Sequence, residues 1–179
     1  MMFMSASDDY IASRCCILNG LFSGFVLACQ AIEKILKVFV YLETREKTKL
    51  TKNDKHNPFK LKEELQKVKK YGLDKFDGLL QKLYDHYQCR YYDNEVSGQG
   101  ASSSELDTID ELWVYLVEIL PIPDEVKYRL KFFTDLFNEN SKKYGTNYWA
   151  EKNNKALAEK IQEMESGYKA VLHHLYPKI

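Results

Sequence analysis

The sequence predicts an all-α protein, and three features of its 179 residues indicate this class. Apolar residues recur at intervals of three and four over most of the chain, which is the spacing of one helix face. Only 4 prolines and 8 glycines interrupt that pattern, whereas a turn-rich β fold needs more of both. No segment alternates apolar and polar residues for long enough to predict a strand. We expect these helices to pack together as a bundle.

The composition suits one globular domain. Hydrophobic residues make up 45% of the chain and charged residues 29%, which is an ordinary balance. A chain of this length buries a core without disulfides or a structural metal. We therefore expect a single domain, 1–179.

Two helices are expected in the N-terminal part. The first begins near Ser7, because Ser7, Asp8 and Asp9 supply a cap and negative charge for a helix N-terminus. It bends or ends around Asn19 and Gly20. The second runs to about residue 41 or 42, and its inward face is predicted at Leu21, Phe25, Ala28, Ile32, Ile35 and Phe39.

Four polar residues share another face of this second helix: Gln30, Glu33, Lys34 and Lys37. Two interpretations stay open for them. Glu33 and Lys37 are four residues apart in the favourable order for a solvent-exposed ion pair. Alternatively, the whole set lines a groove between helices.

Residues 47–57 are a polar, lysine-rich connector, and Pro58 suits the first turn of a third helix. That helix stops before Gly72 and faces inward with Leu61, Leu65 and Val68. The inward residues of a fourth helix are Leu73, Phe76, Leu80, Leu83 and Tyr87, and residues 91–104 form a Gly- and Ser-rich loop.

Three helices are expected after this loop. The fifth has inward residues Leu106, Ile109, Leu112, Trp113, Leu116 and Leu120, and Pro121 and Pro123 end it. The sixth is marked by Val126, Leu130, Phe133 and Phe137. The last carries a heptad-like apolar series of Leu157, Ile161, Met164, Tyr168, Val171 and Leu175.

Charge is balanced overall but unevenly distributed. Lys+Arg and Asp+Glu both count 26. Residues 43–70 hold ten basic and five acidic side chains, a charge of +5, whereas residues 91–126 hold nine acidic side chains and no Lys or Arg. This polarity indicates either pairing of two faces within the chain or a head-to-tail partner. The strongly basic charge of many nucleic-acid-binding domains is absent.

The cysteine pattern and the N-terminal region suggest a cytoplasmic protein. Cys15, Cys16, Cys29 and Cys89 match neither a disulfide framework nor a zinc signature, so reduced thiols are expected. Residues 15–32 carry no charge, but polar and glycine residues interrupt them, and we expect an amphipathic helix rather than a membrane span. The acids Asp8 and Asp9 argue against a secretion signal.

Few residues match a known chemical motif. His86 and Cys89 are three apart on one helix, but no second pair completes a metal site, and none is expected. Residues 83–93 place four tyrosines around Arg90. Arginine with aromatic rings can hold a phosphate and stack a base. The alternative, which is the more common one, is that Arg90 satisfies the last carbonyls of its helix.

Three segments resemble the HEPN family of helical bundles. Residues 28–37, ACQAIEKILK, are similar to the family's second helix. His56 and the residues after it, HNPFKL, resemble the element that opens the third helix. Residues 87–93, YQCRYYD, resemble the Tyr…Arg-Tyr-Pro-Asp element after the fourth helix, with Tyr92 where proline is usual. The resemblance covers about residues 7–120 and implies an antiparallel helical bundle of about five helices there. Residues 121–179 are then expected as two additional C-terminal helices, an extension packed on the bundle. The resemblance also implies frequent homodimers and work on nucleotides or RNA.

Catalytic members of this family cleave RNA with an arginine that is followed, after four to six residues, by histidine. The chain has four arginines, and none of them has a histidine at that spacing. They are Arg14, Arg45, Arg90 and Arg129. The chain therefore departs from the ribonuclease pattern. We assign no catalytic residue and expect no cofactor.

The leading hypothesis is a non-catalytic HEPN-like module that binds a nucleotide or RNA, or that pairs with a nucleotidyltransferase-type protein partner. The predicted ligand-binding residues are Glu33, Lys34, Lys37, His56, Arg90 and Tyr91. Lys37 and Arg90 would contact phosphate, and Tyr91 would stack. Two alternatives stay open: a divergent ribonuclease toxin that uses His56 and Arg90, as in toxin–antitoxin pairs, and a homodimeric scaffold with no small ligand.

Overall fold

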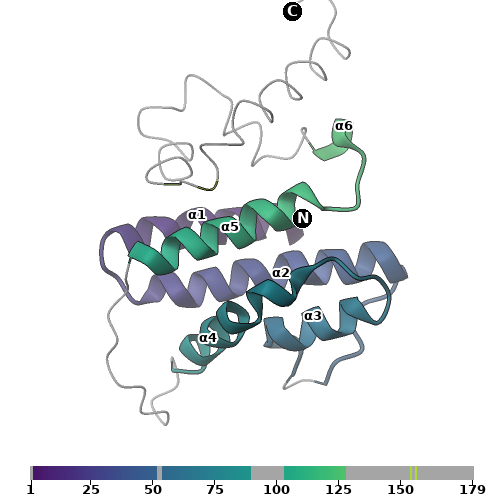
Figure 1. The fold of residues 1–179 in the computed structure, drawn as a ribbon, viewed down its shortest axis with the longest axis horizontal. Coiled ribbons are helices and arrows are strands. Elements are labelled where there is room, and N and C mark those ends of the chain that lie inside the picture. Colours follow the sequence, from purple (N-terminus) through teal and green to yellow (C-terminus); the bar gives the residue numbers. More distant parts are fainter. Residues whose placement is uncertain (1, 52–53, 90–102, 128–153, 155, 157–179) are drawn as a thin grey trace, which may run out of the picture. The chain divides into compact units, whose positions relative to one another are not determined.

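The structure is a computed structural model, and it describes residues 2–51, 54–89, 103–127, 154 and 156. The chain divides into two compact units, Met1–Pro121 and Ile122–Ile179. Within the described residues every regular element is a helix, which confirms the all-α class. In the first unit, α2 lies between α1 and α5 on one side and α3 and α4 on the other (Figure 1).

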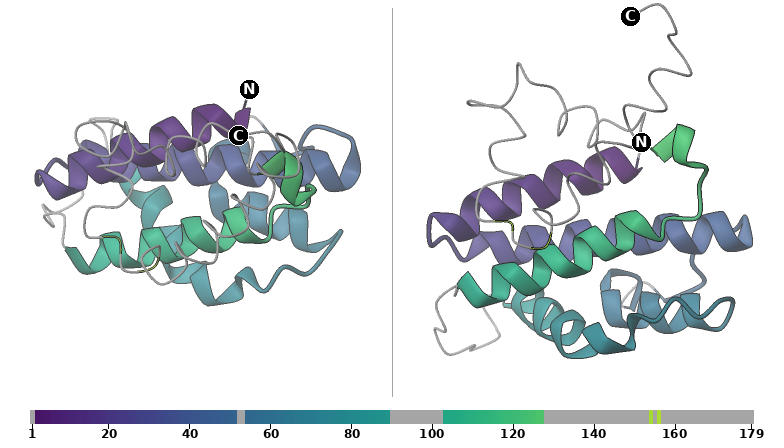
Figure 2. Two further views of the ribbon diagram at one scale, coloured as in Figure 1. Left: turned by 90° about the horizontal axis from the view of Figure 1, so that it is seen from above. Right: turned by 45° about the horizontal axis from the view of Figure 1, so that its top comes forward.

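The helices α1 (Met2–Leu18) and α2 (Ser23–Thr44) form a closely packed pair. Gly20 turns the chain between them with a φ of 72°, a left-handed conformation that suits glycine because it has no Cβ. A Cβ on Gly24 would lie 2.5 Å from the Ile17 side chain. The bare backbone at Gly24 therefore lets the two helices approach and run side by side (Figure 2).

Helix α5 (Ser103–Glu118) closes the core over α1 and α2. Trp113 is fully buried, and its ring stacks on Tyr10 with centroids 4.5 Å apart. All six inward residues predicted for this region are buried: Leu106, Ile109, Leu112, Trp113, Leu116 and Leu120. Complete burial of one such side chain contributes roughly 1.5–3 kcal/mol, so this stripe fixes α5 in place.

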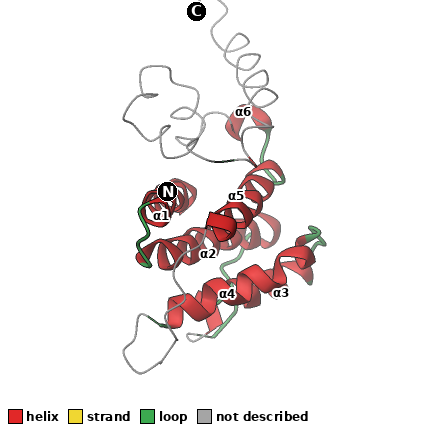
Figure 3. Ribbon diagram, turned by 60° about the vertical axis from the view of Figure 1, so that its left-hand side comes forward, coloured by secondary structure: helices red, strands yellow, loops and turns green. Residues whose placement is uncertain are grey.

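Two short 3₁₀ helices and two α-helices cover the other side of α2. In chain order they are η1 (Asp54–His56), α3 (Pro58–Gln66), η2 (Leu73–Phe76) and α4 (Asp77–Gln88), and α3 and α4 lie side by side in Figure 3. The Asn57 side chain accepts hydrogen bonds from the backbone N–H groups of Phe59 at 2.9 Å and Lys60 at 3.3 Å. Together with Pro58 at the first position, this cap fixes where α3 begins.

The structure corrects several expectations. Helix α1 begins at Met2 rather than near Ser7, which lies inside it and donates to the Phe3 carbonyl at 3.2 Å. Leu21 is 53% exposed because it lies in the turn before α2, and Val68 is 51% exposed because α3 ends at Gln66. Both had been predicted to face inward.

In the second unit, the structure describes residues 122–127, which include α6 (Asp124–Lys127), and the single residues Asn154 and Ala156. The rest of the predicted sixth helix, the predicted last helix and most of the predicted loop at residues 91–104 lie outside the described residues. The two C-terminal helices therefore stay predictions.

Two further features concern the membrane and redox chemistry. No helix in the described part of the chain combines the length and the apolar character that a bilayer crossing requires. All four cysteines are free, and Cys29 is buried as a small apolar side chain.

Candidate functional site

Three of the six predicted ligand-binding residues meet at one carboxylate oxygen. The Oε1 atom of Glu33 accepts a hydrogen bond from Lys37 Nζ at 2.5 Å and lies 3.1 Å from His56 Nδ1. We call these three residues the Glu33 cluster. They come from two separate elements, α2 and η1, so folding assembles the cluster from distant parts of the sequence.

Helix α2 supplies the acid and the ammonium group one turn apart. Glu33 and Lys37 are four residues apart in the order that favours an ion pair. The Glu33 residue is buried, and a buried carboxylate is costly unless charged or hydrogen-bonded partners surround it. The ion pair of the first interpretation therefore forms, but its carboxylate is buried and contacts His56 of η1 instead of lying exposed to solvent.

The turn before α3 supplies the imidazole. The Asn57 N–H donates to the Asp54 carbonyl at 2.8 Å, and the Thr51 hydroxyl donates to the Asp54 carboxylate at 2.8 Å. These bonds and the Asn57 cap hold the backbone on both sides of His56. Its side chain is 42% exposed, so the ring reaches Glu33 with one edge and solvent with the rest.

Aromatic rings from α4 lie beside the cluster. Tyr87 is buried, and its ring is within 20° of parallel to the His56 ring at a centroid distance of 6.5 Å. Tyr84 continues the row 6.4 Å beyond Tyr87, at 16°. Burial, aided by the nearby Asp54 carboxylate, raises the pKa of Tyr84, so its phenol stays neutral at pH 7.

The cluster offers two hydrogen-bonding groups to a ligand. The Glu33 carboxylate only accepts hydrogen bonds, so His56 Nδ1 carries a proton and Nε2 is left for a ligand or water. The Lys37 ammonium group has three protons, and the contact with Glu33 occupies one of them. The arrangement suits an anion or a polar group placed near a neutral aromatic wall.

Of the other three predicted residues, the structure describes only Lys34, and Lys34 is not part of this cluster. Lys34 is directed toward α1, where its Nζ atom contacts Asp9 Oδ2 at 2.5 Å and Ser5 Oγ at 2.8 Å. Consecutive positions on a helix point about 100° apart, which separates Lys34 from Glu33. Arg90 and Tyr91 lie outside the described residues.

His86 and Cys89 do not share a ligand. His86 packs between Phe22 and Phe25, stacked on Phe25 with centroids 4.7 Å apart. Neither of its ring nitrogens has a hydrogen-bond partner in the structure as described, and burial lowers its pKa. Cys89 Sγ donates to the Asp85 carbonyl at 2.8 Å. The described residues contain no group of three or more His, Cys, Asp and Glu side chains placed to hold a metal ion.

The sequence analysis missed a charged network in the core. Arg14 Nε and Nη2 donate to the two Asp110 carboxylate oxygens, each at 2.9 Å. The Tyr10 hydroxyl donates to Asp110 at 2.7 Å, and the Arg14 and Asp110 side chains have no exposed surface. The sequence did contain a sign of this network, because each of the two charged residues lies on an apolar helix face. Arg14 is one turn after Tyr10, and Asp110 is one turn before Trp113.

Of the two networks described above, the Glu33 cluster is the one open to solvent. In comparisons with known proteins, no family model, no curated protein and no solved structure matches this chain.

Proposed function

We propose that this chain is a non-catalytic HEPN-like module that binds a nucleotide or an RNA segment through the Glu33 cluster. The observation that carries the proposal is the pair of contacts to one buried carboxylate oxygen, from Lys37 Nζ and His56 Nδ1. The proposal includes the antiparallel bundle over residues 7–120 and the two-helix extension over residues 121–179.

Preorganisation is the physical reason to expect a phosphate ligand. The buried carboxylate holds a flexible lysine side chain in one place before any ligand arrives, which reduces the conformational entropy lost on binding. The remaining Lys37 protons can then donate to phosphate oxygens, and such charge-assisted hydrogen bonds are stronger than neutral ones. His56 Nε2 adds a further donor when the ring is protonated and an acceptor when it is neutral.

The row of rings on α4 supports a ligand that also carries a base. Tyr87 is covered by its neighbours, whereas Tyr84 at the end of the row is partly exposed. An exposed phenol ring provides a stacking surface for any base. By sequence, Arg90 and Tyr91 follow directly after α4, and the proposal assigns them a second phosphate contact and a second stacking ring.

The test compares two lysines of the same helix. Binding of ATP and of a single-stranded RNA of about ten nucleotides is measured by titration calorimetry with the wild-type chain, Lys37→Ala and Lys34→Ala. Loss of a hydrogen bond to a charged group costs roughly 1.5–3 kcal/mol. We therefore expect Lys37→Ala to weaken binding by about tenfold to a hundredfold.

Lys34→Ala is the matched control, because Lys34 contacts α1 instead of the cluster. It should leave the affinity unchanged. Equal losses in the two variants would place the ligand elsewhere, and no binding of either ligand to the wild-type chain would refute the proposal.

The contact between Glu33 and His56 favours a second candidate, a divergent ribonuclease. Cleavage without a metal needs a base for the 2′-hydroxyl and a cation at the phosphate. A carboxylate that fixes the His56 tautomer leaves Nε2 to act as that base, with Lys37 or Arg90 as the cation. Degradation of RNA by the purified wild-type chain, abolished in His56→Ala, would favour this function over simple binding.

Assembly is a separate part of the proposal. The HEPN resemblance implies a homodimer or a complex with a nucleotidyltransferase-type partner. Light scattering of the purified chain at tens of micromolar measures the first of these directly. A strictly monomeric chain would leave the heteromeric partner as the remaining mode of assembly.

A further inference from the structure

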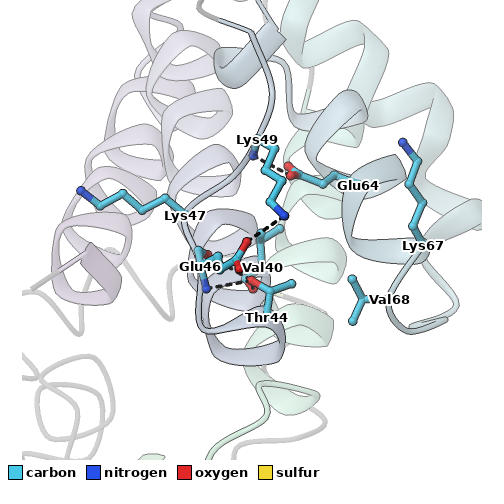
Figure 4. Close-up of a pocket in the computed structure, with 8 residues that line it drawn as sticks. All are labelled: Val40, Thr44, Glu46, Lys47, Lys49, Glu64, Lys67 and Val68. Carbon is cyan, nitrogen blue, oxygen red and sulfur yellow. Dashed lines mark hydrogen bonds and ion pairs between the residues drawn. The ribbon is translucent and has the colours of Figure 1, made fainter.

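A pocket lies between the C-terminal ends of α2 and α3, apart from the Glu33 cluster residues. We call it the α2–α3 pocket, and its volume is about 270 Å³. Eight residues line it, as shown in Figure 4: Val40, Thr44, Glu46, Lys47, Lys49, Glu64, Lys67 and Val68. Sites for drug-sized ligands are usually about 300–1,000 Å³, so this one has room for a single large side chain or a small ring.

The apolar part of the pocket comes from Val40 on α2 and Val68 after α3. Val40 is buried, but Val68 is 51% exposed. Covering a half-exposed valine at the mouth of a concave site with a second apolar group is favourable, because it removes apolar surface from water. One apolar side chain of a partner would pack against Val40 and remove Val68 from water.

The carboxylates at the pocket are already engaged. Glu64 accepts a hydrogen bond from the Lys49 N–H at 2.7 Å and another from the Thr48 hydroxyl. Lys49 Nζ pairs with Glu46 at 2.8 Å. This contact lowers the pKa of Glu46.

The rim carries unpaired positive charge. Lys47 and Lys67 are exposed, and neither ammonium group forms an ion pair with a residue that the structure describes. Figure 4 shows their side chains directed away from the pocket on opposite sides. A ligand confined to the pocket would not reach both, whereas a chain laid across it would.

These features separate the kinds of ligand. Two helix C-termini meet at the pocket, and their partial negative charge adds to the Glu46 and Glu64 carboxylates. A phosphate group inside the pocket would be repelled. An apolar group inside it and negative charges on its rim are both favoured, and this is the usual layout of an anchor residue in a protein interface.

We propose that the α2–α3 pocket docks an acidic segment of a partner protein, which inserts one large apolar side chain between Val40 and Val68. The carboxylates of that segment pair with Lys47 and Lys67 on either side. The charge of +5 carried by residues 43–70 attracts such a segment over a longer range.

The test is a selection of random twelve-residue peptides displayed on phage. The wild-type chain and the double variant Lys47→Glu/Lys67→Glu are used as separate targets. Both lysines are exposed and unpaired, so charge reversal should leave the fold intact, which thermal unfolding of the variant checks. The Glu33 cluster is untouched in this variant, so ATP binding through that cluster is scored independently.

We expect the wild-type chain to enrich peptides with Asp or Glu on both sides of a Leu, Phe or Trp. The best peptide should lose about tenfold or more in affinity for the double variant, and also for Val68→Asp. Enrichment of basic or uncharged peptides, or an acidic peptide that binds the double variant equally well, would overturn the proposal. The proposal would also be overturned if the double variant lost the binding of a single-stranded RNA but kept the binding of the peptide.

Discussion

Two of the charged networks in the described residues use similar groups in different surroundings. In the first, Arg14 and Asp110 join α1 to α5 with no exposed surface on either side chain. In the second, Glu33 is buried, but its partners Lys37 and His56 are 18% and 42% exposed. Charge pairing alone therefore does not distinguish a structural network from a binding site.

The difference lies in how many hydrogen-bonding groups remain available. Both carboxylate oxygens of Asp110 are occupied by Arg14, and Tyr10 supplies a further donor. A charge without solvent requires such complete pairing. Lys37 and His56 keep protons or lone pairs that face water, so a ligand can replace water there without breaking the network.

The largest effect is expected from breaking the buried network. Arg14→Met would leave the Asp110 carboxylate in the core without its cation, and such losses cost about 3–5 kcal/mol. Urea denaturation measures the change in the free energy of unfolding. A cost below about 1 kcal/mol, as for an exposed ion pair, would show that the network is less important than its burial indicates.

The double variant Arg14→Met/Asp110→Leu sharpens this comparison. Replacing both members of a buried pair by apolar residues is often neutral. We expect the double variant to recover most of the stability lost in Arg14→Met. A double variant that is less stable than the single variant would mean that the pair itself, and not the uncompensated charge, carries the stability.

A moderate and pH-dependent effect is expected at His86, which is buried without the partners that Asp110 has. Burial lowers its pKa below the ordinary value of 6.5. The unfolded chain therefore binds a proton at a higher pH than the folded chain does, and His86 makes the fold less stable as the pH falls below 6.5. The variant His86→Leu should lose this dependence.

The measurement is the free energy of unfolding of the wild-type chain and of His86→Leu at several pH values. We expect the variant to gain stability relative to the wild-type chain as the pH is lowered from about 7 to about 5. A difference that stays constant over this range would mean that the imidazole titrates alike in the folded and unfolded chains.

Local signals in the sequence predicted much of the fold. The spacing of apolar residues located the inward faces of α5 and most of α2, and Pro58 marked the start of α3. The two inward positions that failed, Leu21 and Val68, lie just outside helix ends. The spacing of apolar residues can continue in the sequence past the end of a helix. The helical backbone that directs those side chains into the core stops at that end.

The site was less predictable because its contacts are distant in sequence. His56 is 23 residues from Glu33, and no local rule shows that the carboxylate turns inward to meet it. Lys34 and Lys37 look equivalent in the sequence, yet Lys34 contacts Asp9 on α1 whereas Lys37 contacts Glu33. The pair of Arg14 and Asp110, 96 residues apart, was missed for the same reason.

The most direct test of the proposed site observes two histidines in one experiment. Histidine side-chain signals are recorded in ¹H–¹⁵N NMR spectra and assigned with His56→Ala and His86→Leu. A single-stranded RNA of about ten nucleotides is then titrated into the wild-type chain. We expect the His56 signals to move and the His86 signals to stay in place. Binding of the RNA with unchanged His56 signals would contradict the assignment of the Glu33 cluster as the ligand site.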